Sequence, residues 1–102
     1  MTNVTFRVFN VKYYRKLGPL NEQYAVSLML YLDENPGSTT TSLKDISASY
    51  YVIKKVAEQL AADDLVEMEA TNEPGGKVIY RLSSKGKKIA KKLKEIEGIL
   101  EG

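Results

Sequence analysis

Residues 49–60, SYYVIKKVAEQL, decide the fold of this 102-residue chain. Ile53, Val56 and Leu60 recur at spacings of three and four, which predicts the buried face of an α-helix. Ser49 is a natural N-cap ahead of it. The first two turns carry two tyrosines and two lysines: Tyr50, Tyr51, Lys54 and Lys55. A helix that begins with aromatic, hydroxyl and cationic side chains can place its N-terminal end in a DNA groove, so its neighbours in the chain decide its role.

A short helix precedes this one. Residues 37–42 are polar and predict a loop, after which Leu43 and Ile46 predict a helical segment over residues 43–47. A tight corner at residues 47–49 then leads into the second helix, which we expect to end near Asp63. Two helices joined by such a corner form a helix-turn-helix.

A core helix is expected further upstream, over residues 22–34, with Asn21 as its N-cap and an end at the Asn-Pro-Gly sequence of residues 35–37. Residues 1–20 fit both strand and helix periodicity. We expect a short extended start and then a helix over residues 11–17.

A β-hairpin follows the helix-turn-helix. Residues 65–70 and 77–82 predict two strands, and residues 71–76 between them are rich in turn-forming residues. Ser83 then caps a final helix over residues 84–99, in which we interpret Gly86 as a mild weakness of the first turn.

From Leu43 onward this order resembles the winged helix-turn-helix of the MarR-like and ArsR-like transcriptional regulators. Three local features carry the resemblance, which covers about residues 20–95. Leu60 precedes a Leu-Val pair at residues 65–66 by the usual spacing, although Asp64 stands where that group has glycine. A turn-forming wing tip follows, and residues 82–86, LSSKG, resemble the Leu-Thr-x-x-Gly start of the last helix. The implied fold class is α+β: a three-helix core, a two-stranded β-wing and a C-terminal helix.

The resemblance implies double-stranded DNA as the partner. It also implies that a basic residue near the wing tip enters the minor groove. Lys77 and Arg81 are the basic residues nearest the wing tip, and we assign the minor-groove role to Lys77. Lys54 and Lys55 are candidates for phosphate contacts, and Ser49, Tyr50 and Tyr51 for contacts with bases or sugars. The alternatives are packing at the edge of the core for the tyrosines and plain solvent exposure for the lysines.

Charge is unevenly distributed, although the net charge is only +2. Residues 74–94 hold eight basic side chains and no acid, whereas residues 63–73 hold acids and no base. This asymmetry predicts an electropositive face, against the alternative of a solvated lysine-rich helix.

The last helix also carries an apolar stripe with heptad spacing: Ile89, Leu93, Ile96 and Leu100. We expect this stripe to form a homodimer, with residues 1–20 as a further contribution. The alternative is that it packs only on its own domain.

Several classes of function are disfavoured by composition. The chain has no His and no Cys, and we recognise no phosphate-binding glycine loop, so we expect no enzyme, no cofactor and no metal site. It has neither an apolar run long enough for a membrane span nor a secretory signal, so we expect a cytoplasmic protein without membrane partners.

The sequence therefore predicts a single domain over residues 1–102, divided into an N-terminal segment (1–20), a helix-turn-helix with wing (21–82) and a C-terminal helix (83–102). We expect a homodimeric, sequence-specific DNA-binding regulator, a repressor in preference to an activator. A protein-interaction module and a non-specific chromosomal DNA-binding protein stay open as alternatives, and so does a small apolar effector at the dimer interface.

Overall fold

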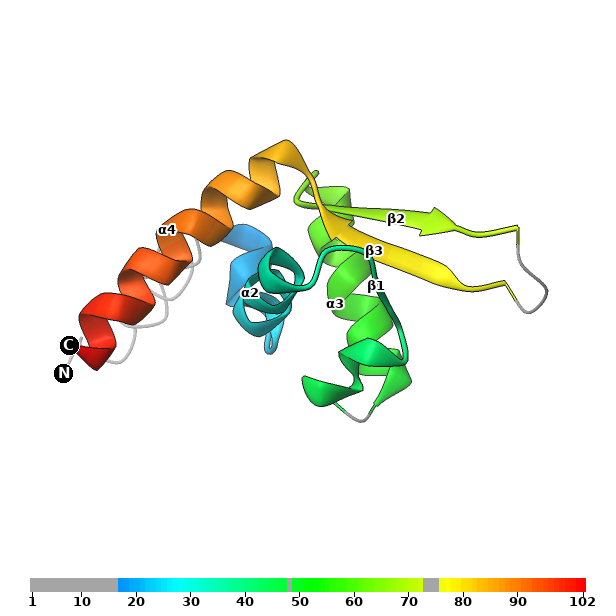
Figure 1. The fold of residues 1–102 in the computed structure, drawn as a ribbon, viewed down its shortest axis with the longest axis horizontal. Helices are drawn as coiled ribbons and strands as arrows, with labels where there is room; N and C mark the ends of the chain where they lie inside the picture. Colours follow the sequence, from blue (N-terminus) through cyan, green and yellow to red (C-terminus); the bar gives the residue numbers. More distant parts are fainter. Residues whose placement is uncertain (1–16, 48, 73–75) are drawn as a thin grey trace, which may run out of the picture.

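The computed structural model of the protein describes residues 17–47, 49–72 and 76–102. The extended start expected at the N-terminus lies outside this part, and so does the helix expected over residues 11–17, except for residue 17. The elements are η1 (Gly18–Asn21), α2 (Ala25–Glu34), β1 (Ser38–Thr39), η2 (Ser42–Asp45), α3 (Tyr50–Ala62), β2 (Val66–Ala70), β3 (Val78–Leu82) and α4 (Ser84–Glu101). This is an α+β winged helix, as predicted. The β2–β3 wing and α4 project from the core in opposite directions (Figure 1).

The sheet has three antiparallel strands in the order β1-β3-β2. The prediction of a plain loop over residues 37–42 is wrong at its start, because Ser38 and Thr39 pair with Tyr80 and Ile79 of β3. A two-residue strand is too short to show an alternating pattern. Its position is fixed locally, since the buried Ser38 hydroxyl donates a 2.6 Å hydrogen bond to the carbonyl oxygen of Asn35.

Helix α2 starts three residues later than expected, and Asn21 is not its N-cap. Asn21 belongs to η1, where its side-chain amide donates a 3.2 Å hydrogen bond to the carbonyl oxygen of Gly18. Tyr24 precedes the helix in the left-handed conformation at φ 70°, and its carbonyl oxygen accepts from the Leu28 amide at 2.8 Å. Tyrosine carries no sequence signal for such a turn.

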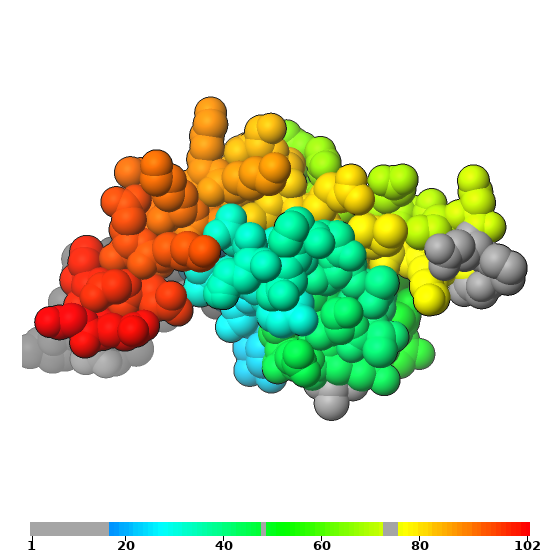
Figure 2. Space-filling model, in the orientation of Figure 1, coloured from blue at the N-terminus to red at the C-terminus, as the bar shows by residue number. Residues whose placement is uncertain are grey.

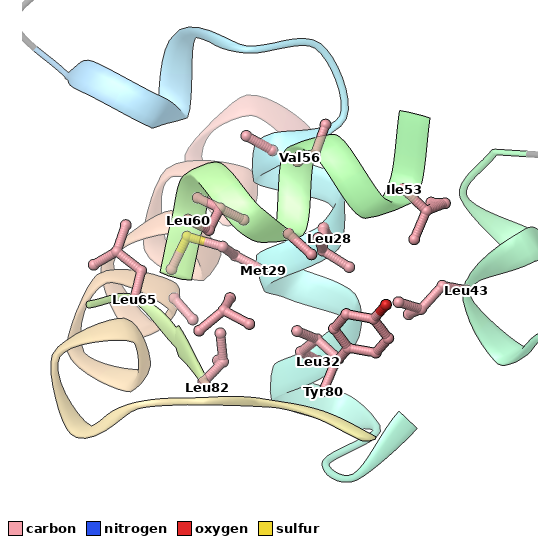
Figure 3. Close-up of a cluster of buried hydrophobic side chains, with 14 residues drawn as sticks. Leu28, Met29, Leu32, Leu43, Ile53, Val56, Leu60, Leu65, Tyr80 and Leu82 are labelled. Carbon is pink, nitrogen blue, oxygen red and sulfur yellow. The ribbon is translucent and has the colours of Figure 1, made fainter. Parts of the chain in front are cut away.

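The core lies between α2, α3 and the base of the hairpin (Figure 3). The predicted stripe of Ile53, Val56 and Leu60 is buried, as is Ala57 beside it. Fully buried large side chains share this cluster: Tyr80, Leu28, Met29, Leu32, Leu43, Ile53 and Leu60. Truncating a buried leucine or isoleucine to alanine in such a core costs about 2–5 kcal/mol of stability. The orientation of α3 therefore follows from its apolar face.

Both ends of α3 confirm the predicted caps. The Ser49 hydroxyl oxygen accepts from the Val52 amide at 3.3 Å, which fixes the N-terminus at Tyr50. At the other end Asp64 is left-handed, with φ 62°. The chain then turns so that the Leu65 amide donates to the Leu60 carbonyl oxygen at 2.9 Å. Asp64 thus performs the backbone role that glycine usually has at a helix C-terminus.

A hydrogen-bonded cluster joins this turn to the start of α4. Ser83 accepts from the Gly86 amide at 2.9 Å and donates its hydroxyl proton to the Asp64 carbonyl oxygen. The interpretation of Gly86 as a weakness is wrong. A β-carbon there would collide with the carbonyl oxygen of Leu65, so the close approach of α4 to the α3–β2 turn requires glycine.

Within the described residues, no helix is both long enough and apolar enough to cross a membrane.

Candidate nucleic-acid interface

The N-terminal turns of α3 expose the predicted contact residues. Tyr51 is 82% exposed and Tyr50 is 52% exposed, and their rings meet edge to face with centroids 6.1 Å apart. Lys54 and Lys55 are exposed on the next turn. Ile53, which lies between the tyrosine pair and the lysine pair in the sequence, is buried. The helix therefore separates a core face from a face of hydroxyl, aromatic and ammonium groups.

The wing brings one further cation to this side of the molecule. Lys77 is exposed just before β3, and its carbonyl oxygen accepts a 2.8 Å hydrogen bond from the Thr71 amide. This bond extends the hairpin ladder by one pair beyond Ala70 and Val78. Lys77 is therefore anchored by its backbone while its side chain is exposed.

A hollow of about 500 Å³ lies between the wing and α3. It is lined by Tyr50 from α3, by Gly76, Lys77 and Val78 from the wing, by Thr39 at the end of β1, and by Thr40 and Thr41 between β1 and η2. We call it the wing hollow. It brings Tyr50 and Lys77, two of the predicted site residues, to a single concave surface.

The three threonines of the wing hollow are candidate functional residues that the sequence does not reveal. They fall within the predicted polar loop, and a Thr-Thr-Thr run carries no specific binding signal. The short β1–β3 pairing is what carries them to the wing. Thr40 is further held by a 3.0 Å hydrogen bond between its hydroxyl and that of the buried Tyr80.

Arg81 lies elsewhere. Its guanidinium is 3.9 Å from a carboxylate oxygen of Glu69 on the neighbouring strand, and it lines a small separate hollow together with Asp33 and Lys87. In β3 it precedes Leu82, at the end of the strand that leads into α4. The structure therefore brings Tyr50 and Lys77 together and does not bring Arg81 to them.

The apolar stripe of α4 divides into two halves. Ile89 and Leu93 are half-buried and pack against the core cluster. Ile96 is 52% exposed and Leu100 82% exposed, and Ile99 beside them is 78% exposed. The first half of the stripe thus belongs to the fold of the single chain, and the second half presents apolar surface. This second half lies in the C-terminal part of α4, which projects from the core (Figure 2).

The basic run is partly neutralised on α4. Lys94 donates a 2.7 Å hydrogen bond to the Asp33 carboxylate of α2, and this bond is the main reason that the pKa of Lys94 lies above its ordinary value. Partial desolvation opposes the rise, and the charge of Asp33 adds to it. Lys92 lies 3.5 Å from Glu95. Among the residues that the structure describes, no three acidic side chains lie close enough together to hold a metal ion.

The helix-turn-helix, the hairpin wing and the exposed helix face define a winged-helix transcriptional regulator, as the resemblance implied. Residues 37–101 match the profile of the HxlR-like helix-turn-helix family, and the chain belongs to that family. A comparison with curated protein sequences finds no match.

Solved structures of regulators share the fold at low sequence identity. A transcriptional regulator homologue from Pyrococcus horikoshii OT3 is 13% identical with a TM-score of 0.72, over 90% of this chain and 94% of that one. The regulator HlyU from Vibrio vulnificus CMCP6 is 17% identical with a TM-score of 0.64, over 94% of this chain and 98% of that one. Reduced YodB from B. subtilis is 18% identical with a TM-score of 0.64, over 78% of this chain and 79% of that one. At these identities the similarity establishes the fold.

Proposed function

We propose that this HxlR-like protein is a cytoplasmic, homodimeric repressor that binds specific sequences of double-stranded DNA. In this proposal the N-terminal turns of α3 enter the major groove, and the wing tip brings Lys77 to the adjacent minor groove and the phosphates at its edge. The observation that carries the proposal is the shared position of Tyr50 and Lys77 on the wing hollow, because it makes helix and wing one continuous surface.

The exposed side chains divide into two roles by their chemistry. Lys54, Lys55 and Lys77 attract phosphates, which position the protein on the duplex. Ser49, Tyr50 and Tyr51 carry hydroxyl groups that can bond to base edges or sugars. Arg81 is assigned only to the overall electropositive field, since it lies outside the wing hollow, at the end of β3 that leads into α4.

A homodimer follows in the proposal from the second half of the α4 stripe. Ile96, Ile99 and Leu100 expose apolar surface that a second copy of α4 would cover. Two-fold symmetry would place two α3 helices about one DNA turn apart, and the preferred site would be an inverted repeat. A dimer seated in this way represses by excluding other proteins from the site.

The test compares two double substitutions of equal charge. Lys54→Ala with Lys55→Ala should reduce duplex affinity and make its salt dependence shallower. The negative slope of log affinity against log salt should shrink in magnitude by about 1.8, since each lysine–phosphate contact contributes about 0.9. Lys91→Ala with Lys92→Ala, on the helix that projects away from the wing, should leave the slope unchanged. An unchanged slope in the Lys54 and Lys55 variant would remove α3 from the DNA interface.

A further inference from the structure

The wing hollow has more hydrogen-bond donors than the proposed role of its helix and wing uses. Four residues that carry a hydroxyl group line it, Thr39, Thr40, Thr41 and Tyr50, together with Lys77. None of the lining residues within the described part of the chain carries a carboxylate. A concave surface that offers an ammonium group and several hydroxyl-bearing residues suits a small, strongly accepting anion.

Thr40 is connected to a buried group behind it. Tyr80 is 1% exposed, and its ring belongs to the same core cluster as Leu32 and Leu43 (Figure 3). Its hydroxyl lies 3.0 Å from that of Thr40. Either oxygen can be the donor in this bond. Because each hydroxyl has a single proton, the direction of the bond depends on what Thr40 meets in the hollow.

We propose that the wing hollow holds one backbone phosphate of the bound duplex, with Lys77 and Thr40 as the contacting residues and Tyr80 as a positioning residue. A phosphate oxygen only accepts, so Thr40 donates its proton to it. Tyr80 then donates to Thr40, and the two bonds point the same way and strengthen each other. This inference rests on the proposed DNA binding and assigns one of its contacts.

The two contacting residues should leave different signatures in binding. Lys77 neutralises the phosphate and releases counterions, so its loss lowers the salt slope. Thr40 is neutral, and its loss weakens binding at every salt concentration while the slope stays the same. If Thr40 acted only in folding, its loss would also leave the slope unchanged, but it would not alter the sensitivity of binding to any particular phosphate.

The experiment uses the full chain and its selected duplex. Thr40→Val removes the hydroxyl with little change in shape and should weaken binding about tenfold, the value of a hydrogen bond to a charged group. Thr40→Ser keeps the hydroxyl and should restore binding to within about twofold.

Tyr80→Phe should weaken binding in the wild-type background and have no further effect in Thr40→Val. Lys77→Gln should lower the salt slope by about 0.9. Urea unfolding of each variant shows whether it is folded at the binding temperature.

A duplex with one neutral methylphosphonate, moved step by step along the backbone, locates the contact. At one position the modification should weaken wild-type binding more than it weakens Thr40→Val binding, because the variant has already lost the Thr40 hydrogen bond and keeps only the Lys77 contact with that phosphate. If Thr40→Val binds as wild type with the same methylphosphonate profile, the phosphate contact is wrong while DNA binding stands. If wild type binds no duplex, the proposed function and this inference both fail.

Inorganic phosphate alone serves as the probe for a free anion. We expect no saturable shift of the Thr40 amide signal in NMR spectra on adding millimolar phosphate without DNA. A saturable shift, combined with unchanged duplex binding of Thr40→Val, would assign the hollow to a free anion and overturn the DNA contact.

Discussion

Gly86 in the first turn of α4 packs directly against the carbonyl oxygen of Leu65, closer than any residue with a β-carbon could approach. The same carbonyl oxygen accepts a 3.0 Å hydrogen bond from the Ser83 amide. The contact therefore fixes where α4 leaves the wing. Since the second half of α4 carries the exposed apolar residues of the proposed dimer, this small contact sets the direction of the surface on which dimerisation depends.

Gly86→Ala should destabilise the fold by roughly 1–3 kcal/mol, the usual cost of forcing atoms into a packed site. The matched control is Gly98→Ala in the same helix, where a β-carbon would meet nothing within 4 Å. That variant should gain up to about 1 kcal/mol from helix propensity. Urea unfolding followed by circular dichroism measures both. Equal stability of the two variants would contradict the packing of α4 described above.

Asp64→Gly should leave stability within about 1 kcal/mol of wild type or raise it, because glycine relieves the left-handed strain but adds entropy to the unfolded chain. Asp64→Val should be clearly less stable, since a β-branched residue at φ 62° is strained. Thermal unfolding of both variants checks the order. If valine were tolerated as well as glycine, the turn could not be left-handed.

The Lys94–Asp33 ion pair predicts a titration at high pH. The pKa of Lys94 is raised in the folded protein, so the pair's contribution is fully present below the ordinary lysine pKa of about 10.4 and is lost as the pH rises through the raised value. Asp33→Asn should return the Lys94 pKa towards its ordinary value in an NMR titration. Glu95→Gln is the matched control and should leave the Lys94 midpoint in place. Identical Lys94 midpoints in wild type and Asp33→Asn would contradict the pair.

Ile96→Glu should shift the protein from dimer to monomer in sedimentation at micromolar concentration. The added charge would lie against the apolar surface of the second copy. Gly98→Glu adds the same charge on the outer side of α4 and should leave the dimer intact. If wild type itself sediments as an 11.4 kDa monomer, both the dimer and the inverted repeat are wrong.

Regular periodicity made most of the fold predictable. The stripe of Ile53, Val56 and Leu60 predicted the buried face of α3, and Ser49 and Ser83 predicted the starts of the two helices that they cap. These features are local, and burial and capping reinforce each other at each of them.

Contacts between distant segments were not predictable in the same way. Strand β1 exists because β3 pairs with it, and Gly86 is needed because Leu65 lies beside it. Thr40 belongs to the candidate site only because the wing lies beside it, and Arg81 lies outside the site because it stands at the end of β3 that leads into α4. Periodicity carries no information about such partners.

Selection of bound duplexes from a random pool at physiological salt shows whether the protein binds specific DNA as a two-fold dimer. We expect enrichment of an inverted repeat whose half-sites lie about one DNA turn apart, because two α3 helices of a two-fold dimer would read it. Lys54→Ala with Lys55→Ala should lose this enrichment. A pool that returns without sequence preference, although the protein is folded and dimeric, would contradict specific DNA binding.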